Sequence, residues 1–231
     1  MDRPHAVTAL LLAGCAGGVA PGDSGLAGHP GAQLAAEVVS ATAAGDRRFA
    51  DPALAVNGVR GGGTFQGGLD VYRVGTAPGD ELVLAFPSPV VDGDGVDLAV
   101  FENPFAVRGG GGTFVDPAVV EVSADCEVFV AFPHAYEGGD AYLAAPAAWA
   151  GFAGVTPVQL HEEDDPVDPL GPDAGGDGFD LAALADPALA DGVVCVRITA
   201  AATWTDPATG AAYPADPLSD GPDIDGVYGR E

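Results

Sequence analysis

Short runs in which apolar and polar residues alternate recur along the chain from Val38 onward, separated by clusters of glycine, proline and aspartate. Period-2 alternation puts the apolar side chains on one face of an extended chain, which is typical of a half-buried β-strand. The pattern predicts strands at residues 69–74, 81–86, 97–102, 118–123, 127–132, 193–199 and 224–229. Many short strands separated by turns favour an all-β fold, an antiparallel two-sheet sandwich with a jelly-roll-like arrangement.

Two local features refine this prediction. Residues 118–123 and 127–132 are close enough along the chain to predict a hairpin with a short loop. Residues 35–44 and 181–184 are each expected to form a short helix, and no long amphipathic helical period occurs elsewhere.

The apolar run near the N-terminus ends in Leu12-Ala13-Gly14-Cys15, which has the form of a bacterial lipobox. The run is shorter than the roughly 20 residues that cross a bilayer. We therefore expect a signal peptide over 1–14, a lipidated Cys15 with a flexible tether over 15–36, and a single sandwich domain over 37–231. An ordinary signal peptide, or an apolar N-terminus without such a role, is the alternative.

Lipidation predicts a place in the bacterial cell envelope, as an outer-membrane lipoprotein or at the cell surface, with membrane contact through the lipid anchor only. The net charge is −26, and all eight basic residues are arginines. Because no basic stripe exists to displace counterions from a phosphate backbone, nucleic acid is excluded as a partner. Repulsion among the acidic residues destabilises a compact chain unless cations screen or bind it.

Cys126 and Cys195 are the cysteines that remain after Cys15. In an oxidising compartment we expect them to form a disulfide, which closes a loop of about 70 residues and stabilises the fold by about 4 kcal/mol. Two buried free thiols are the alternative.

Acidic residues gather in clusters that predict calcium sites. In the densest cluster, the turn at residues 91–97, aspartates alternate with glycines. A hard cation such as Ca²⁺ takes about six to eight oxygen ligands, and glycine lets a turn fold its oxygens inward. The candidate metal ligands are Asp92, Asp94, Asp97, Glu102, Asp177, Asp180, Asp223 and Asp225. Solvated acidic turns are the alternative.

Trp149 and Trp204 lie in two long segments, residues 134–178 and 200–222. Loops of this length in a compact domain are usually functional or stabilised by an ion. Exposed rings there would bind a ligand by stacking on a sugar, whereas buried rings would plug the ends of the sandwich.

Catalytic motifs are missing from the sequence. The chain has no nucleophile elbow, no zinc-protease helix motif and no phosphate loop before a helix. We therefore expect a non-catalytic surface lipoprotein that is stabilised by calcium and binds a glycan or a surface protein through its long loops. The alternatives are an envelope polysaccharide hydrolase that uses two carboxylates, and a purely structural envelope component.

Several segments follow one another in order along the chain: DLAVFENPF, VEVSAD, GGDGFDL and VRIT. This order resembles a family of bacterial cell-surface proteins and lipoproteins of largely unassigned function. The resemblance implies a β-sandwich like that of carbohydrate-binding modules. Within the FEN string, Pro104 stops the ladder and leaves Glu102 and Asn103 at the rim of a sheet. There they would either accept N–H groups from a loop or complete an ion shell with Asp180.

Overall fold

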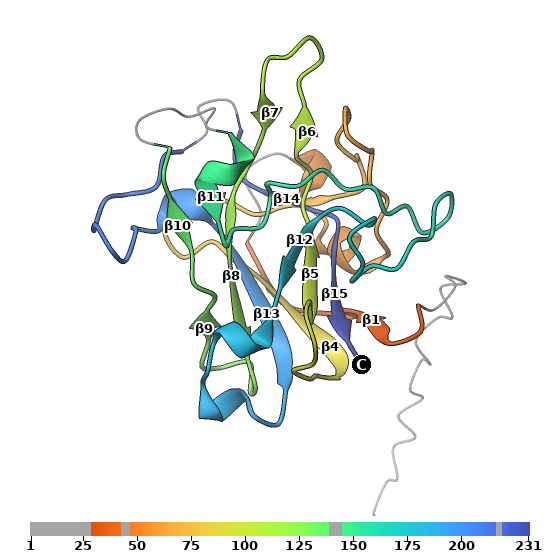
Figure 1. Ribbon diagram of the computed structural model, residues 1–231, viewed down its shortest axis with the longest axis vertical. Coiled ribbons are helices and arrows are strands. Elements are labelled where there is room, and N and C mark those ends of the chain that lie inside the picture. The colour runs from red at the N-terminus through yellow and green to blue at the C-terminus, as the bar shows by residue number, and fades with distance from the viewer. Residues whose placement is uncertain (1–28, 43–46, 139–144, 216–218) are drawn as a thin grey trace, which may run out of the picture.

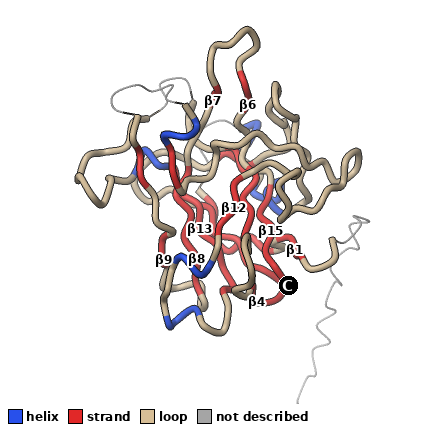
Figure 2. Tube along the Cα trace, viewed as in Figure 1, coloured by secondary structure: helices blue, strands red, loops and turns tan. Residues whose placement is uncertain are grey.

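The computed structural model describes residues 29–42, 47–138, 145–215 and 219–231. They form an all-β protein in which two antiparallel sheets pack face to face (Figures 1 and 2). In these ranges the helical elements are all short 3₁₀ turns. The all-β sandwich predicted from the alternating pattern is confirmed.

The first sheet has four strands in the order β1-β15-β5-β12. Its strands are β1 (Ala32–Leu34), β5 (Leu98–Phe101), β12 (Asp177–Phe179) and β15 (Gly226–Arg230). The second sheet has five strands in the order β2-β4-β13-β8-β9. Its strands are β2 (Glu37–Ala41), β4 (Leu82–Val90), β8 (Ala118–Ser123), β9 (Val130–Ala131) and β13 (Val193–Ala200).

Smaller elements decorate the sandwich. Three two-stranded pairs are β3 (Tyr72–Arg73) with β14 (Asp223–Ile224), β6 (Phe105–Ala106) with β7 (Thr113–Phe114), and β10 (Ala135–Tyr136) with β11 (Trp149–Ala150). The 3₁₀ helices are η1 (Arg47–Phe49), η2 (Pro52–Val56), η3 (Pro146–Ala148), η4 (Leu181–Ala183), η5 (Pro187–Leu189) and η6 (Ala201–Thr203). The β6–β7 hairpin projects beyond one end of the sandwich (Figure 1).

The main core lies between the two sheets, because alternate residues of the facing strands point inward. Leu84 of β4, Val120 of β8 and Val100 of β5 are fully buried in it. The residues between them point to the outer faces, which accounts for the alternation seen in the sequence.

The outer face of the four-stranded sheet is also covered. Phe101 of β5 and Tyr228 of β15 pack there against Val158 and Leu160, which belong to a long connecting segment. The two rings meet edge to face with their centroids 6.2 Å apart. Burial on both faces explains why all four residues of β5 are apolar and buried.

Two predictions near the N-terminus are wrong. The helix predicted over residues 35–44 is replaced by strand β2, which pairs antiparallel with β4. Pairing with a neighbouring strand here outweighs the helix propensity of alanine. Strand β1 lies inside the segment predicted as a tether and pairs with β15, so the folded body begins before residue 37.

The predicted hairpin joins β8 to β9, although β9 is shorter than the apolar run from which it was predicted. Cys126 lies in its turn and forms a disulfide with Cys195 of β13, the strand beside β8. The disulfide therefore ties the tip of an edge hairpin to a central strand of the same sheet.

Cys15 and the predicted signal peptide lie outside the described residues. Among the residues that are described, no helix has the length and apolar character needed to span a bilayer.

Candidate functional site

Strand β5 divides the candidate metal ligands into two groups. Asp97 precedes the strand and Glu102 follows it, and a rise of about 3.3 Å per residue separates the two by roughly 16 Å. Both β12 and β15 run antiparallel to β5. One end of the sheet therefore carries Asp92, Asp94, Asp97 and Asp180, and the other carries Glu102, Asp177, Asp223 and Asp225.

This separation excludes one predicted arrangement. Glu102 cannot complete an ion shell with Asp180, because the two residues lie at opposite ends of the paired strands β5 and β12. Glu102 follows β5 and Asp180 follows β12, and because these two strands are antiparallel, their ends lie at opposite edges of the pair.

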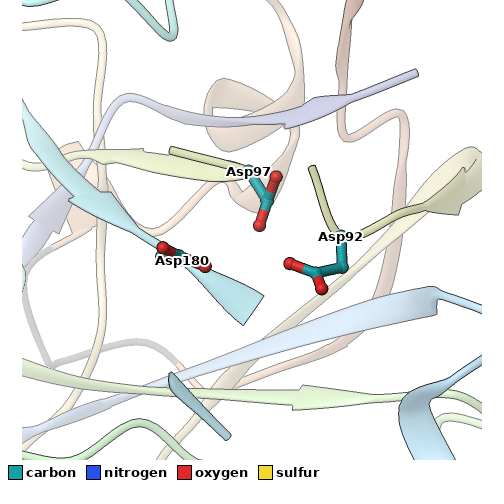
Figure 3. A group of neighbouring side chains, drawn as sticks. All are labelled: Asp92, Asp97 and Asp180. Atoms are coloured by element: carbon teal, nitrogen blue, oxygen red, sulfur yellow. The ribbon is translucent and has the colours of Figure 1, made fainter. Parts of the chain in front are cut away.

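Three carboxylates converge at the first end of the sheet, which we call the aspartate triad: Asp92, Asp97 and Asp180. Each contributes an oxygen, and the three oxygens lie within 4.8 Å of one another. Figure 3 shows Asp92 and Asp97 on either side of a turn, with Asp180 facing them from the end of β12. Asp97 is fully buried, whereas Asp92 is exposed. The triad thus has a buried floor and a side that faces solvent.

Hydrogen bonds hold the buried carboxylate in place. Asp97 Oδ1 accepts from the Gly93 amide at 3.0 Å, and Oδ2 accepts from the Leu181 amide at 2.9 Å. Asp180 Oδ1 accepts from the Ala182 amide at 2.8 Å and so caps η4. Two of the three carboxylates are therefore oriented by the backbone before any ligand arrives.

Arg230 is a cation that contacts the triad directly. Its Nε donates to Asp97 Oδ1 at 2.8 Å. Its Nη2 donates to the main-chain oxygens of Asp94 and Val96, at 2.9 and 2.7 Å. The guanidinium thus already binds the main-chain carbonyl oxygens that a metal ion in the turn would use as ligands. The Asp94 side chain is not part of the triad. The carboxylates that converge are therefore not those of successive aspartates in the turn. Asp92 and Asp97 instead meet Asp180, which follows β12.

The opposite end of the sheet uses its acidic residues mainly to anchor loops. Glu102 Oε1 accepts from the Asp223 amide at 2.8 Å. Asn103 contacts Gly68 twice, since Oδ1 accepts from the amide and Nδ2 donates to the carbonyl oxygen at 2.9 Å. Asp223 itself forms a two-pronged ion pair with Arg73, at 2.7 and 2.9 Å. Two roles were predicted for Glu102 and Asn103, namely anchoring a loop and completing an ion shell with Asp180. The contacts observed are those of residues that anchor loops.

Burial raises the pKa of several carboxyls at this end. Asp225 is 1% exposed, and burial raises its pKa to about 7 although its Oδ2 accepts from the Arg60 amide at 2.8 Å. Burial likewise raises the pKa of Asp177 to about 6, against the effect of hydrogen bonds from the Val155 and Gly154 amides. Burial, together with the charges of nearby acids, raises the pKa of Glu102 well above its usual range.

The two tryptophans do not form an exposed platform. Trp149 is 2% exposed and packs against Phe152 and Tyr213, while Trp204 is half-buried and donates from Nε1 to Thr199 Oγ1 at 2.8 Å. Their packing is that of rings which plug the end of the sandwich. A stacked sugar would find no free face on Trp149 in this arrangement.

A shallow groove lies beside the aromatic cluster and has a volume of about 420 Å³. We call it the tyrosine groove, and its polar lining consists of Tyr136, Asp206, Thr209 and Tyr213. A carboxylate and a hydroxyl beside the half-buried ring of Tyr136 suit a polyhydroxylated ligand, while the Tyr213 ring is only 4% exposed. Sequence reasoning missed Tyr136 and also Arg230, because neither belongs to a local motif and only pairing of distant segments places them.

Comparisons of the chain with protein-family models, with curated proteins and with solved structures found no match. The resemblance to bacterial cell-surface proteins therefore stays a prediction.

Proposed function

We propose that this chain is a non-catalytic surface lipoprotein of the bacterial cell envelope, whose sandwich is stabilised by calcium at the aspartate triad and binds a glycan in the tyrosine groove. The observation that carries the proposal is the convergence of three carboxylate oxygens within 4.8 Å. Oxygen ligands gathered around one point are the arrangement that Ca²⁺ requires.

The charges at the triad favour a divalent cation. Three carboxylates face one guanidinium, that of Arg230, so two negative charges are left without a partner in this group. A single Ca²⁺ would compensate that charge. Its remaining ligands would be water, which reaches the site past the exposed Asp92.

The burial of the other carboxylates favours binding over hydrolysis. A glycosidase needs two carboxyl groups about 5–10 Å apart across an open cleft. The acids with raised pKa values lie inside the protein, where Glu102 is 2% and Asp225 is 1% exposed. A polysaccharide chain could not reach them without a rearrangement of the loops.

Thermal melting with calcium or with EGTA tests the cation part of the proposal. We expect calcium to raise the melting temperature of the wild type, and the double variant Asp92→Asn/Asp180→Asn to lose most of that rise. Asp94→Asn is the control for the Asp92 change, because it removes one charge from the same turn without touching the triad. A wild type whose melting temperature ignores both calcium and EGTA would contradict the proposal.

A glycan array tests the groove. We expect Asp206→Asn to weaken binding of any glycan that the wild type retains, since a carboxylate accepts sugar hydroxyls more strongly than an amide. Asp206 Oδ1 accepts a hydrogen bond from the Ala208 amide, and Asp186 Oδ1 accepts one from the Ala188 amide in the same way. Asp186→Asn is therefore the control, because Asp186 lies outside the groove. Equal binding by both variants would place the ligand elsewhere.

A further inference from the structure

We propose a second, buried calcium site between Glu102 and Asp116, at the opposite end of β5 from the aspartate triad. The site goes beyond the proposed function, because it shares no ligand with the triad and does not depend on it.

The first observation is a buried carboxylate oxygen with no partner. Glu102 is 2% exposed, and its Oε1 accepts from the Asp223 amide at 2.8 Å. Its Oε2 is buried and makes no hydrogen bond. A buried acceptor without a donor destabilises the folded state, and more so when it carries charge. A proton, a water molecule or a cation could satisfy Oε2, and the surroundings of this oxygen favour a cation.

The second observation is the acidic surrounding of that oxygen. Asp116 and Asp223 are the charged groups that, after burial, most strongly raise the pKa of Glu102. Asp223 is already engaged by Arg73 through two hydrogen bonds. Asp116 is itself 8% exposed, so a second carboxylate is buried beside Glu102. Repulsion between two buried carboxylates disfavours their ionised forms, and a cation between them would offset that repulsion.

The third observation is the glycine beside Glu102 Oε2. Gly154 has a φ of +84°, and a β-carbon at this position would lie 3.2 Å from Glu102 Oε2 and would clash with the main-chain oxygen of Asp116. The glycine thus allows a close approach of the backbone, at a point where a carboxylate oxygen and a carbonyl oxygen lie near each other. Both are ligand types that Ca²⁺ accepts.

A small cavity lies beside Asp116. Asp116 lines a cavity of about 60 Å³ together with Thr76, Ser219 and Pro222. A water molecule takes about 30 Å³, so the cavity has room for the water that would complete a coordination shell. The same cavity touches Pro214, which also lines the tyrosine groove. An ion here would therefore lie close to a segment that also lines the tyrosine groove.

Calcium stoichiometry measured by isothermal titration on the full chain tests the inference. We expect two ions for the wild type and one for Asp92→Asn/Asp180→Asn. We expect none when Glu102→Gln is added to that double variant, because the amide keeps the contact to the Asp223 amide but removes the charge of Oε2. If the wild type binds a single calcium ion, and this ion remains in Asp92→Asn/Asp180→Asn but is lost when Glu102→Gln is added, the proposed function is contradicted. The site at Glu102 is then supported.

Glu162→Gln in the same double variant is the matched control. Glu162 is also buried with one unpartnered oxygen, Oε2, while its Oε1 accepts from Tyr228 and the Val59 amide. We expect it to retain one ion. A double variant that binds no calcium overturns the inference and indicates a proton on Glu102 instead. If Glu102→Gln does not fold, anomalous diffraction from calcium-soaked wild-type crystals decides, and a map without a peak between Glu102 and Asp116 overturns the site.

Discussion

The guanidinium of Arg230 donates from Nε to Oδ1 of Asp97 over 2.8 Å. Asp97 is fully buried, and Arg230 ends β15, which pairs with the strand that follows Asp97. The last strand of the chain thus provides the cation that neutralises the best-buried acid of the β4–β5 turn. The relationship ties the stability of this turn to the C-terminal end of the protein.

Arg230→Ala should destabilise the protein by about 2 kcal/mol, because it leaves the buried charge of Asp97 without its partner. Urea denaturation measures the change in the free energy of unfolding. Arg108→Ala is the control, since Arg108 is exposed and contacts only the ring of Phe65 among the interactions described for it. Equal effects of the two changes would show that the Arg230 contact contributes little.

Glu121 and Arg197 should show a favourable coupling in a double-mutant cycle. They face each other across β8 and β13, and two hydrogen bonds of 2.7 and 2.6 Å join them. Glu121 is 4% exposed, so solvent screens the pair weakly. We expect a coupling of about 1–2 kcal/mol from Glu121→Ala, Arg197→Ala and the double variant. Arg197→Lys should lose most of it, because lysine cannot form the two parallel bonds. A coupling near zero would contradict this.

The buried Asp225 should make stability depend on pH. Its pKa is raised to about 7 by burial, so the folded state holds a proton that the unfolded state releases at lower pH. The stabilisation is complete below about pH 4 and is lost as the pH rises through about 7. With EGTA present, Asp225→Asn should flatten the stability profile between pH 5 and 8 and gain on the order of 3 kcal/mol relative to the wild type at pH 8. A wild-type profile that stays level over this range would contradict the prediction.

Removal of the disulfide should destabilise the protein. Cys126 and Cys195 lie 69 residues apart in sequence, and the loop that they close corresponds to about 4 kcal/mol in the chain-entropy account. Urea denaturation with and without dithiothreitol measures the loss. Dithiothreitol should leave Cys126→Ser/Cys195→Ser unchanged, which separates loss of the bond from other effects of the reductant.

Several strands could be predicted because their local pattern and their tertiary role agree. The run at 118–123 became β8, and that at 193–199 became most of β13, since each strand turns alternate residues into the main core. Residues 35–44 were predicted wrongly because their alanines suit a helix, whereas β4 offers a strand partner. Local propensity could not anticipate that partner.

The residue types of the candidate cation sites were visible in the sequence, but their grouping was not. Aspartates in glycine-rich turns and a glutamate at a strand end mark oxygen ligands, and the high negative charge indicates a need for cations. Which of these oxygens meet depends on the pairing of β12 and β15 with β5. That pairing brings Asp180 to Asp97 and keeps Glu102 away from both. Only the tertiary structure decides it, because strand register arises from contacts between segments far apart in the chain.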